Sequence, residues 1–149
     1  DAFESLLRQL ATHAGSEHGS FSVVASRRTP ERWRGLIAQL PADLPGIRWR
    51  DDRDGANPYA ALLGHADRIV CTPDSVNMLS EAAATLAPVF VWSIGIANGR
   101  LRVFLDALRQ RGRVRDLDDA LAPFEVEPLR ETARVAAEVR QRLEEKGSE

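Results

Sequence analysis

Short apolar runs alternate with segments of helical periodicity along this chain, and that alternation limits the possible folds more than any other feature of the sequence. Four runs rich in β-branched and aromatic residues predict strands at Phe21–Ser26, Ile47–Arg50, Asp67–Thr72 and Pro88–Trp92. The last two runs show little polar alternation, as expected for strands that helices cover on both faces. Because a helical segment separates each strand from the next, we predict a parallel sheet with right-handed crossovers, in a Rossmann-like three-layer α/β/α fold.

Helix signals fill the segments between these strands. Thr29 and Pro30, and again Asn57 and Pro58, pair a capping residue with a proline at the first helical position. The expected helices are Ala2–His13, the segment from Pro30 through Leu40, Tyr59–Leu63, the segment from Asp74 through Leu86, Leu101–Leu108 and Leu129–Leu143. Residues 144–149 form a charged tail that we expect to be frayed.

The composition is that of one ordinary soluble domain. The 149 residues are 44% apolar and 28% charged, with a formal net charge of -2. No apolar run approaches the roughly 18 residues that span a bilayer, and the first twenty residues lack a signal-peptide core. Cys71 is the single cysteine, so a disulfide within the chain is excluded and a reducing compartment is expected. We expect a cytoplasmic protein, with any peripheral membrane association provided by a part outside this chain.

Polar loops follow all four predicted strands, at residues 26–29, 51–57, 72–75 and 93–98. In a doubly wound sheet the ligand crevice lies outside the carboxyl ends of the strands, where helix N-termini direct partial positive charge. Loops are polar for other reasons as well, so the pattern indicates a candidate binding edge without identifying a ligand.

The segment that follows Cys71 has the pattern of an amphipathic helix. At 100° per residue, Asp74, Asn77 and Glu81 lie on one face, and Val76, Leu79, Ala83 and Leu86 lie on the other. The apolar face is expected to pack on the sheet. A structural interpretation suffices for these residues taken alone, with Ser75 or Asp74 as the helix cap and Glu81 on a solvated face.

Several segments resemble known families. The run ADRIVCTPDSVNMLSEAAATLAPVFV is similar to the last nucleotide-binding βαβ unit of GT-B glycosyltransferases, including the UDP-N-acetylglucosamine transferase of peptidoglycan synthesis. More closely, SRRTP at Ser26–Pro30, NPY at Asn57–Tyr59, DSVNMLSEA at Asp74–Ala82 and EPLRETARVA at Glu127–Ala136 resemble the plant mitochondrial-fission "elongated mitochondria" family and its bacterial relatives. The four motifs occur in the right order and span nearly the whole chain.

The GT-B resemblance implies a nucleotide-binding site at the carboxyl ends of the strands. The implied residues are Arg27, Arg28, Thr72, Asp74, Ser75 and Glu81, with Ser26, Asn57, Asn77 and Ser80 as additional candidates. The helix start at Asp74 and Ser75 would face the diphosphate, and Glu81 would accept hydrogen bonds from the ribose. Arg27 and Arg28 would supply a cationic fork. A nucleoside diphosphate sugar is the implied substrate, with no tightly bound cofactor and no resident metal.

Two features depart from the patterns that these resemblances imply. Asp74 places a carboxylate where many GT-B enzymes have a small neutral residue, and it repels a diphosphate unless Arg27, Arg28 or a metal compensates. Bacterial members of the family are often described as nucleoside-diphosphate-sugar epimerases, but the chain has no glycine-rich GxGxxG turn. We therefore do not expect an epimerase.

A GT-B enzyme reacts in the cleft between two Rossmann-like domains. The resemblance therefore implies that residues 1–149 are one such domain, the C-terminal half of a larger protein, and inactive alone as a glycosyltransferase. The first strand of the usual 3-2-1-4-5 order is also absent from the sequence, so the chain is expected to leave a gap in its sheet, to pair with a second copy as a homodimer, or to owe its start to proteolysis. The missing N-terminal half of the same protein is the other expected partner. The alternative is a protein-interaction scaffold without chemistry, because the plant family implies recruitment of a fission GTPase to the mitochondrial surface.

Histidines and serines have simpler explanations than catalysis. His13, His18 and His65 lack partners at zinc-ligand spacing, and the first two are expected in a loop. Ser75 and Ser80 lack the G-x-S-x-G setting of a nucleophile.

Arginines and tryptophans are also explained by structure. The arginines from Arg109 to Arg115 lie at a helix end, where cations offset the helix dipole, so no nucleic-acid ligand is expected. Trp33, Trp49 and Trp92 are scattered singly and are expected in the core or at a domain contact.

Overall fold

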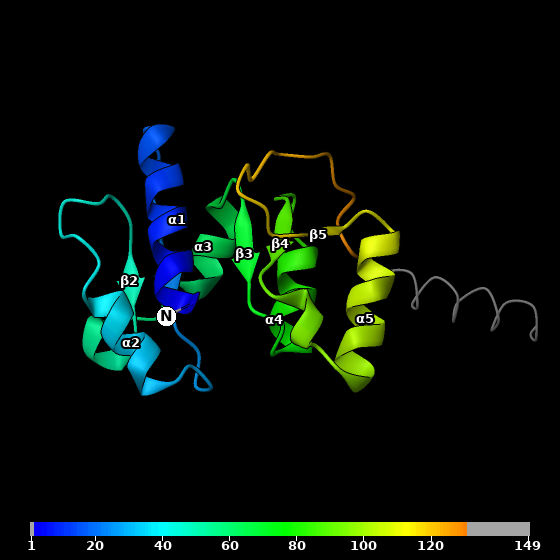
Figure 1. The fold of residues 1–149 in the computed structure, drawn as a ribbon, viewed down its shortest axis with the longest axis horizontal. Helices are drawn as coiled ribbons and strands as arrows, with labels where there is room; N and C mark the ends of the chain where they lie inside the picture. Colours follow the sequence, from blue (N-terminus) through cyan, green and yellow to red (C-terminus); the bar gives the residue numbers. More distant parts are fainter. Residues whose placement is uncertain (1, 131–149) are drawn as a thin grey trace, which may run out of the picture. The chain divides into compact units, whose positions relative to one another are not determined.

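The computed structural model describes residues 2–130 (Figure 1). The chain divides into two compact units, a first unit of Asp1–His65 and a second unit of Ala66–Glu149, and each is described by itself. Within residues 2–130, none of the helices combines the length and the apolar character that a membrane span requires.

The first unit alternates helices with two short parallel strands. Its elements are α1 (Ala2–Ser16), β1 (Val23–Val24), α2 (Glu31–Ala38), β2 (Arg48–Trp49), the 3-10 turn η1 (Asp52–Asp54) and α3 (Tyr59–His65). β1 and β2 pair in parallel, with Val23 opposite Arg48 and Val24 opposite Trp49. α1 packs on α2, where the rings of Phe3 and Trp33 stack with their centroids 4.2 Å apart.

The apolar face of α1 supplies most of the core of the first unit. The buried side chains include Phe3, Leu6, Leu7 and Leu10 of α1, Ile37 of α2 and Trp49 of β2. Burying one such side chain contributes about 1.5–3 kcal/mol. The spacing of the four α1 residues predicts this face, and the burial of Trp49 agrees with its predicted place in the core.

Two predictions for the first unit were wrong. Thr29 does not cap α2, because its hydroxyl accepts a hydrogen bond from the Ser26 N–H at 2.8 Å, and Pro30 takes the cap position. Thr29 therefore closes the turn before the helix. α1 continues to Ser16, so His13 lies in a helix, and only His18 lies in a turn.

The second unit contains a three-stranded parallel sheet. Its elements are β3 (Ile69–Cys71), α4 (Val76–Ala83), β4 (Val89–Val91), the 3-10 turn η2 (Ile94–Ile96), α5 (Gly99–Gln110) and β5 (Val114–Asp116). The strand order is β3-β4-β5. Val89 of the central strand lies opposite Ile69 on one side and Val114 on the other.

The core of the second unit surrounds β4, whose three residues Val89, Phe90 and Val91 are all buried. The other buried apolar residues are Leu79, Ala82, Ala83, Ala87, Leu105, Leu108, Val114 and Leu121. The lack of polar alternation predicts that both β3 and β4 are buried on two faces; β4 confirms this prediction, whereas the three residues of β3 are only half-buried.

One prediction for the second unit was wrong, and one of its strands was not predicted. β5 was not predicted, because only Val114 of its three residues is apolar. α4 ends at Ala83, so Leu86 lies beyond the helix and is 79% exposed, and Val76 in the first turn is 42% exposed. The helix predicted at Leu129–Leu143 lies mostly outside the described residues, and its first two residues are not helical.

The predicted fold class is confirmed. Both sheets are parallel, helices connect their strands, and each of the four predicted runs contains a strand, though each strand is shorter than predicted. The mixed α/β architecture is that of a Rossmann-like fold.

Candidate functional site

The loop after β1 is a self-contained turn that presents two arginines. The Ser26 hydroxyl accepts a hydrogen bond from the Arg28 N–H at 3.1 Å, and the Thr29 N–H donates to the Ser26 carbonyl at 3.1 Å. The two hydroxyls of this loop are therefore used in holding its backbone. The side chains of Arg27 and Arg28 are exposed.

Arg34 of α2 holds this loop in place, a role that was not predicted from the sequence. Its guanidinium donates to the carbonyls of Ser26 at 2.6 Å and Thr29 at 3.3 Å, and also to the carbonyl of Arg50. One side chain thus fixes the carboxyl ends of both β1 and β2. The one feature of the sequence that could have pointed to Arg34 is its position one turn before the buried Ile37 on α2.

The loop after β2 is built from two acid–base pairs. Arg53 donates to both carboxylate oxygens of Asp51, and Arg50 donates to both of Asp54. The hydrogen bond from the Arg53 side chain holds the pKa of Asp51 well below its usual range, and the hydrogen bond from the Arg50 side chain lowers the pKa of Asp54 to about 2. These charges are neutralised within the loop, which leaves no excess positive charge there for a phosphate.

Asn57 has a structural role at the end of the same loop. Its side-chain oxygen accepts a hydrogen bond from the Tyr59 N–H at 3.0 Å, at the first residue of α3. The predicted pairing of a capping asparagine with Pro58 is therefore what begins this helix.

The start of α4 brings together three of the predicted residues. Ser75 is the cap, since its hydroxyl accepts a hydrogen bond from the Met78 N–H at 3.3 Å, and Ser75 is buried. The Thr72 hydroxyl donates to the Asp74 carboxylate at 2.6 Å. The exposed Asp74 carboxylate therefore lies directly before the cap, where it interacts favourably with the helix dipole.

The polar face of α4 has the predicted composition. Asn77 and Glu81 are exposed and Ser80 is half-buried, while the opposite face buries Leu79 and Ala83. Glu81 lies in the second turn from the cap, on the same side of the helix as Asn77.

Arg113 fixes the other end of α4. This buried arginine precedes β5 and donates to the carbonyls of Ala82 at 3.1 Å, Ala83 at 2.7 Å and Thr85 at 2.8 Å. A cation at this point satisfies the last carbonyls of the helix and offsets its dipole. The arginine-rich segment thus serves a helix end as predicted, but Arg113 serves α4 and not the adjacent α5. Burial lowers the pKa of Arg113.

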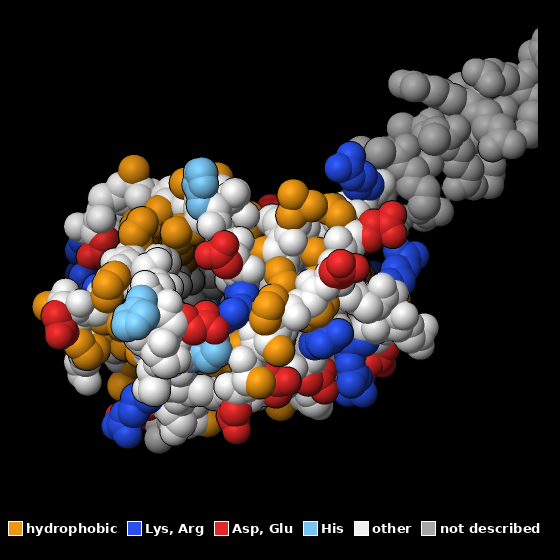
Figure 2. Space-filling model, turned by 90° about the horizontal axis from the view of Figure 1, so that it is seen from above, with side chains coloured by type: hydrophobic (Ala, Val, Ile, Leu, Met, Phe, Trp, Pro, Cys, Tyr) orange, Lys and Arg blue, Asp and Glu red, His pale blue; other side chains and the backbone are white. Residues whose placement is uncertain are grey.

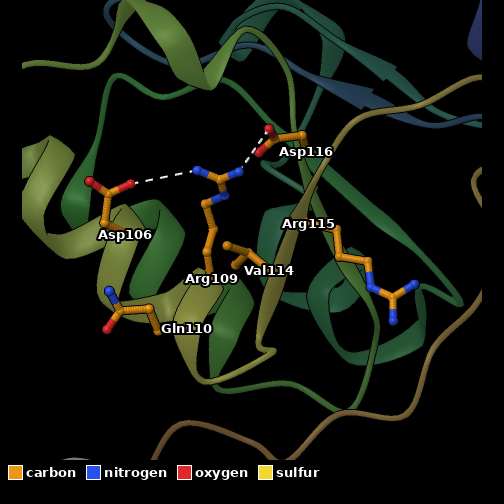
Figure 3. A pocket seen from close by; sticks show the side chains of 6 residues that line it. All are labelled: Asp106, Arg109, Gln110, Val114, Arg115 and Asp116. Carbon is orange, nitrogen blue, oxygen red and sulfur yellow. Dashed lines mark hydrogen bonds and ion pairs between the residues drawn. The ribbon is translucent and has the colours of Figure 1, made fainter.

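An open hollow of about 550 Å³ lies between α5 and β5 in the second unit. Figure 3 shows Arg109 reaching between Asp106 and Asp116, with nitrogen–oxygen distances of 3.6 and 3.2 Å, while Arg115 points away from this pair. The guanidinium of Arg115 lies 4.2 Å from the centroid of the Phe124 ring. Because two carboxylates already neutralise Arg109, the hollow is a poor site for an anion.

None of the predicted site residues lines this hollow. The structure instead groups them by unit, with Ser26, Arg27 and Arg28 in one loop of the first and Thr72, Asp74 and Ser75 at one helix start in the second. On the face seen in Figure 2, acidic and basic side chains are interspersed with hydrophobic ones.

Comparison with known proteins identifies relatives for nearly the whole chain. Residues 1–143 match the family model described as mitochondrial fission ELM1. The chain is 32% identical to the mitochondrial fission protein ELM1 of Arabidopsis thaliana over 97% of its own length and 33% of the relative's. It is 28% identical to the uncharacterized protein RP120 of Rickettsia prowazekii, over 90% of its own length and 38% of the relative's. No solved structure matches. The chain spans between a third and two fifths of the length of these curated relatives, and it belongs to the mitochondrial fission ELM1 family.

Proposed function

We propose that the start of α4 binds the diphosphate of a nucleotide sugar, and that this chain is the nucleotide-binding half of a GT-B-like glycosyltransferase. The observation that carries the proposal is the geometry of that helix start. α4 begins directly after the loop at the carboxyl end of β3, and the Ser75 hydroxyl accepts from the Met78 N–H. In residues 2–130, the backbone N–H groups of Val76 and Asn77 make no hydrogen bond to the protein. Such N–H groups and the helix dipole together favour a phosphate.

Glu81 is proposed to recognise the ribose. It is exposed on the polar face of α4, and a carboxylate accepts hydrogen bonds from two adjacent hydroxyls. A nucleoside diphosphate therefore gains contacts at both positions along the helix, with the phosphates at the start and the sugar near the second turn.

The carboxylate of Asp74 repels an anion at the same helix start, so a change at Asp74 tests the proposal. This carboxylate accepts a hydrogen bond from the Thr72 hydroxyl at 2.6 Å, and its negative charge lies next to the proposed phosphate position. We expect Asp74→Asn, which keeps the size and a hydrogen-bond acceptor, to bind a nucleoside diphosphate more tightly. Asn is also a good residue beside a helix start, so the variant retains the local fold.

The experiment is a calorimetric titration of the full-length protein, at the length of the curated relatives, with UDP, uridine and pyrophosphate. We expect UDP to bind with a dissociation constant of about 1 mM or lower, which corresponds to about -4 kcal/mol or more favourable. Glu81→Gln should weaken the binding of UDP and of uridine several-fold and leave the binding of pyrophosphate unchanged.

Two results would overturn the proposal. One is the absence of binding for UDP and for the other nucleoside diphosphates at millimolar concentration. The other is binding that is indifferent to Asp74→Asn and Glu81→Gln together. Arg111→Ser is the control for a change outside the proposed site, because Arg111 is exposed and lies at the C-terminal end of α5, and it should leave the titrations unchanged.

A protein-interaction scaffold is the second candidate, favoured by the names of the family and of the Arabidopsis relative, both of which refer to mitochondrial fission. Apolar side chains exposed in the second unit are consistent with this role, since Val103 of α5 is 71% exposed and Ile96 of η2 is 72% exposed. A Val103→Glu variant separates the two functions. It should abolish a scaffold's protein binding and leave the titration with UDP unchanged.

A further inference from the structure

The side chains of α5 divide into three sides of the helix. Leu105 and Leu108 form a buried side, and α5 packs on β5. A second side carries ion pairs. At 100° per residue, a third side spans an arc of about 100° and holds residues at the spacing i, i+3, i+4, i+7 and i+11. The residues of this third side, called the α5 face, are Arg100, Val103, Phe104, Ala107 and Arg111.

The centre of the α5 face is apolar and open to solvent. Val103 is 71% exposed, Ala107 is exposed and Phe104 is half-buried. Apolar residues at this spacing are those with which an amphipathic helix contacts a packing partner. α5 therefore carries a second apolar stripe in addition to the one that it buries.

The positive charges of α5 are distributed unequally between its sides. On the ion-paired side, the carboxylate of Asp106 lies 3.0 Å from a nitrogen of Arg102 and 3.6 Å from one of Arg109. The α5 face contains no carboxylate and has an exposed arginine at each end, Arg100 and Arg111. The side with excess positive charge is therefore the side with the exposed apolar centre.

Local structure does not account for Arg100. This arginine lies in the first turn of α5, where the helix dipole disfavours a cation, and that turn holds no acidic residue. Within residues 2–130, no hydrogen bond or ion pair joins the Arg100 side chain to another residue. A carboxylate supplied by another molecule would pair with this guanidinium and offset the unfavourable dipole.

We propose that the α5 face docks an acidic amphipathic helix of a partner protein. Arg100 and Arg111 are three turns apart, about 16 Å along the helix axis, so carboxylates at that separation on a partner helix pair with both. Apolar side chains between those carboxylates cover Val103 and Phe104, and the small Ala107 allows the two helices to approach closely. The inference rests on the scaffold role, the second candidate function, and it does not depend on nucleotide binding.

A second helix fits this face better than a lipid surface does. Membrane-binding surfaces bury projecting apolar side chains over a broad area. The α5 face is one helix wide and has an alanine, Ala107, within its apolar centre. Charge complementarity then determines the sign of the partner, because the charged residues of the face are all arginines.

The test is a fluorescence anisotropy titration of the full-length protein with two synthetic peptides of about 16 residues, the length of helix that spans the face. Both peptides carry leucines at the spacing i, i+3, i+4 and i+7. One has glutamates beside the leucines, and the other has lysines there. We expect the glutamate peptide to bind at least about 10-fold more tightly than the lysine peptide, and Val103→Glu to weaken its binding at least about 10-fold.

Arg100→Gln and Arg109→Gln are a matched pair, because each removes one positive charge from α5. Arg100→Gln should weaken the binding of the glutamate peptide at least about 3-fold, whereas Arg109→Gln, on the ion-paired side, should leave it unchanged. A UDP titration of Arg100→Gln and Val103→Glu should match that of the unmodified protein, which separates the α5 face from the nucleotide site.

Three results would overturn the proposal. One is equal or tighter binding of the lysine peptide; if Val103→Glu abolishes that binding, the scaffold role stands with a partner of other chemistry. Another is binding of the glutamate peptide that is indifferent to both Val103→Glu and Arg100→Gln. The third is no binding of the glutamate peptide at millimolar concentration. Sedimentation of the protein with vesicles of phosphatidylcholine and phosphatidylserine would in that case identify a membrane as the occupant of the face.

Discussion

Arg113 donates three hydrogen bonds from a buried guanidinium to the carbonyls that end α4. Replacing it with methionine removes all three donors and leaves buried carbonyls without them. We expect Arg113→Met to lower the free energy of unfolding by about 3 kcal/mol. Urea denaturation followed by circular dichroism measures this loss.

Matched variants distinguish the hydrogen bonds from the charge. Arg113→Lys keeps the charge but lacks the planar fork, and should recover only part of the stability. Arg100→Met removes an exposed arginine from the same unit and should change the free energy of unfolding by less than about 0.5 kcal/mol. If Arg113→Met lowered the free energy of unfolding no more than Arg100→Met does, the guanidinium would not hold the end of α4.

Cys71 gives a second prediction, on reactivity. Burial raises the pKa of its thiol from 9.0 to about 12. Since the thiolate is the reactive form, iodoacetamide at pH 8 should alkylate Cys71 at least about 100-fold more slowly in the folded protein than in urea. Mass spectrometry of timed aliquots measures both rates. Similar rates in the two conditions would show that the thiol is not shielded.

Sequence reasoning at the residue scale succeeded where the partner is close along the chain. Ser75 caps α4 through Met78, and Asn57 caps the start of α3, within three residues in each case. It failed for Arg34 and Arg113, whose acceptors lie up to 16 and 31 positions away. Spacing cannot identify such partners, because tertiary structure brings them together.

The turn that leads into β2 has no room for a side chain at Gly46. This glycine adopts φ +134° at the turn before β2, and a Cβ atom there would clash with the carbonyl oxygen of Phe21. Both the backbone conformation and the contact exclude a side chain. We expect Gly46→Ala to lower the free energy of unfolding by at least about 2 kcal/mol, measured by urea denaturation.

Gly35 is the matched control for this substitution. It lies inside α2, and a Cβ atom added to it would meet nothing within 4 Å. Gly35→Ala should therefore stabilise the protein by about 0.5–1 kcal/mol, because alanine is the better helix former. If Gly46→Ala and Gly35→Ala changed the free energy of unfolding in the same direction, this account of the turn would be contradicted.

Element type was predicted more successfully than element length. The apolar run Val89–Val91 was predicted as a buried strand, and its residues are fully buried. β5 was missed because a strand at the edge of a sheet tolerates charge, and Arg115 and Asp116 interrupt any apolar pattern. The sequence predicts that the helix extends to Leu86, but α4 ends at Ala83, where Arg113 donates to the last carbonyls of the helix.

At the scale of the whole molecule, the sequence predicts a class of fold and a family, and both are confirmed. The candidate site was predicted from a resemblance, and the structure places its residues in two groups, one in each unit. The ligand could not be predicted from spacing, because Asp74, Ser75 and Glu81 have the same pattern in a solvated helix as in a nucleotide site.

The central claim is that the start of α4 binds a nucleoside diphosphate, and amide NMR of the full-length protein with UDP tests it most directly. We predict that the largest shift changes occur at Val76 and Asn77, with smaller ones along the polar face to Glu81. The amides of Arg109 and Asp116, beside the hollow in the second unit, should not change. Shift changes confined to the hollow, or none at millimolar UDP, would contradict the claim.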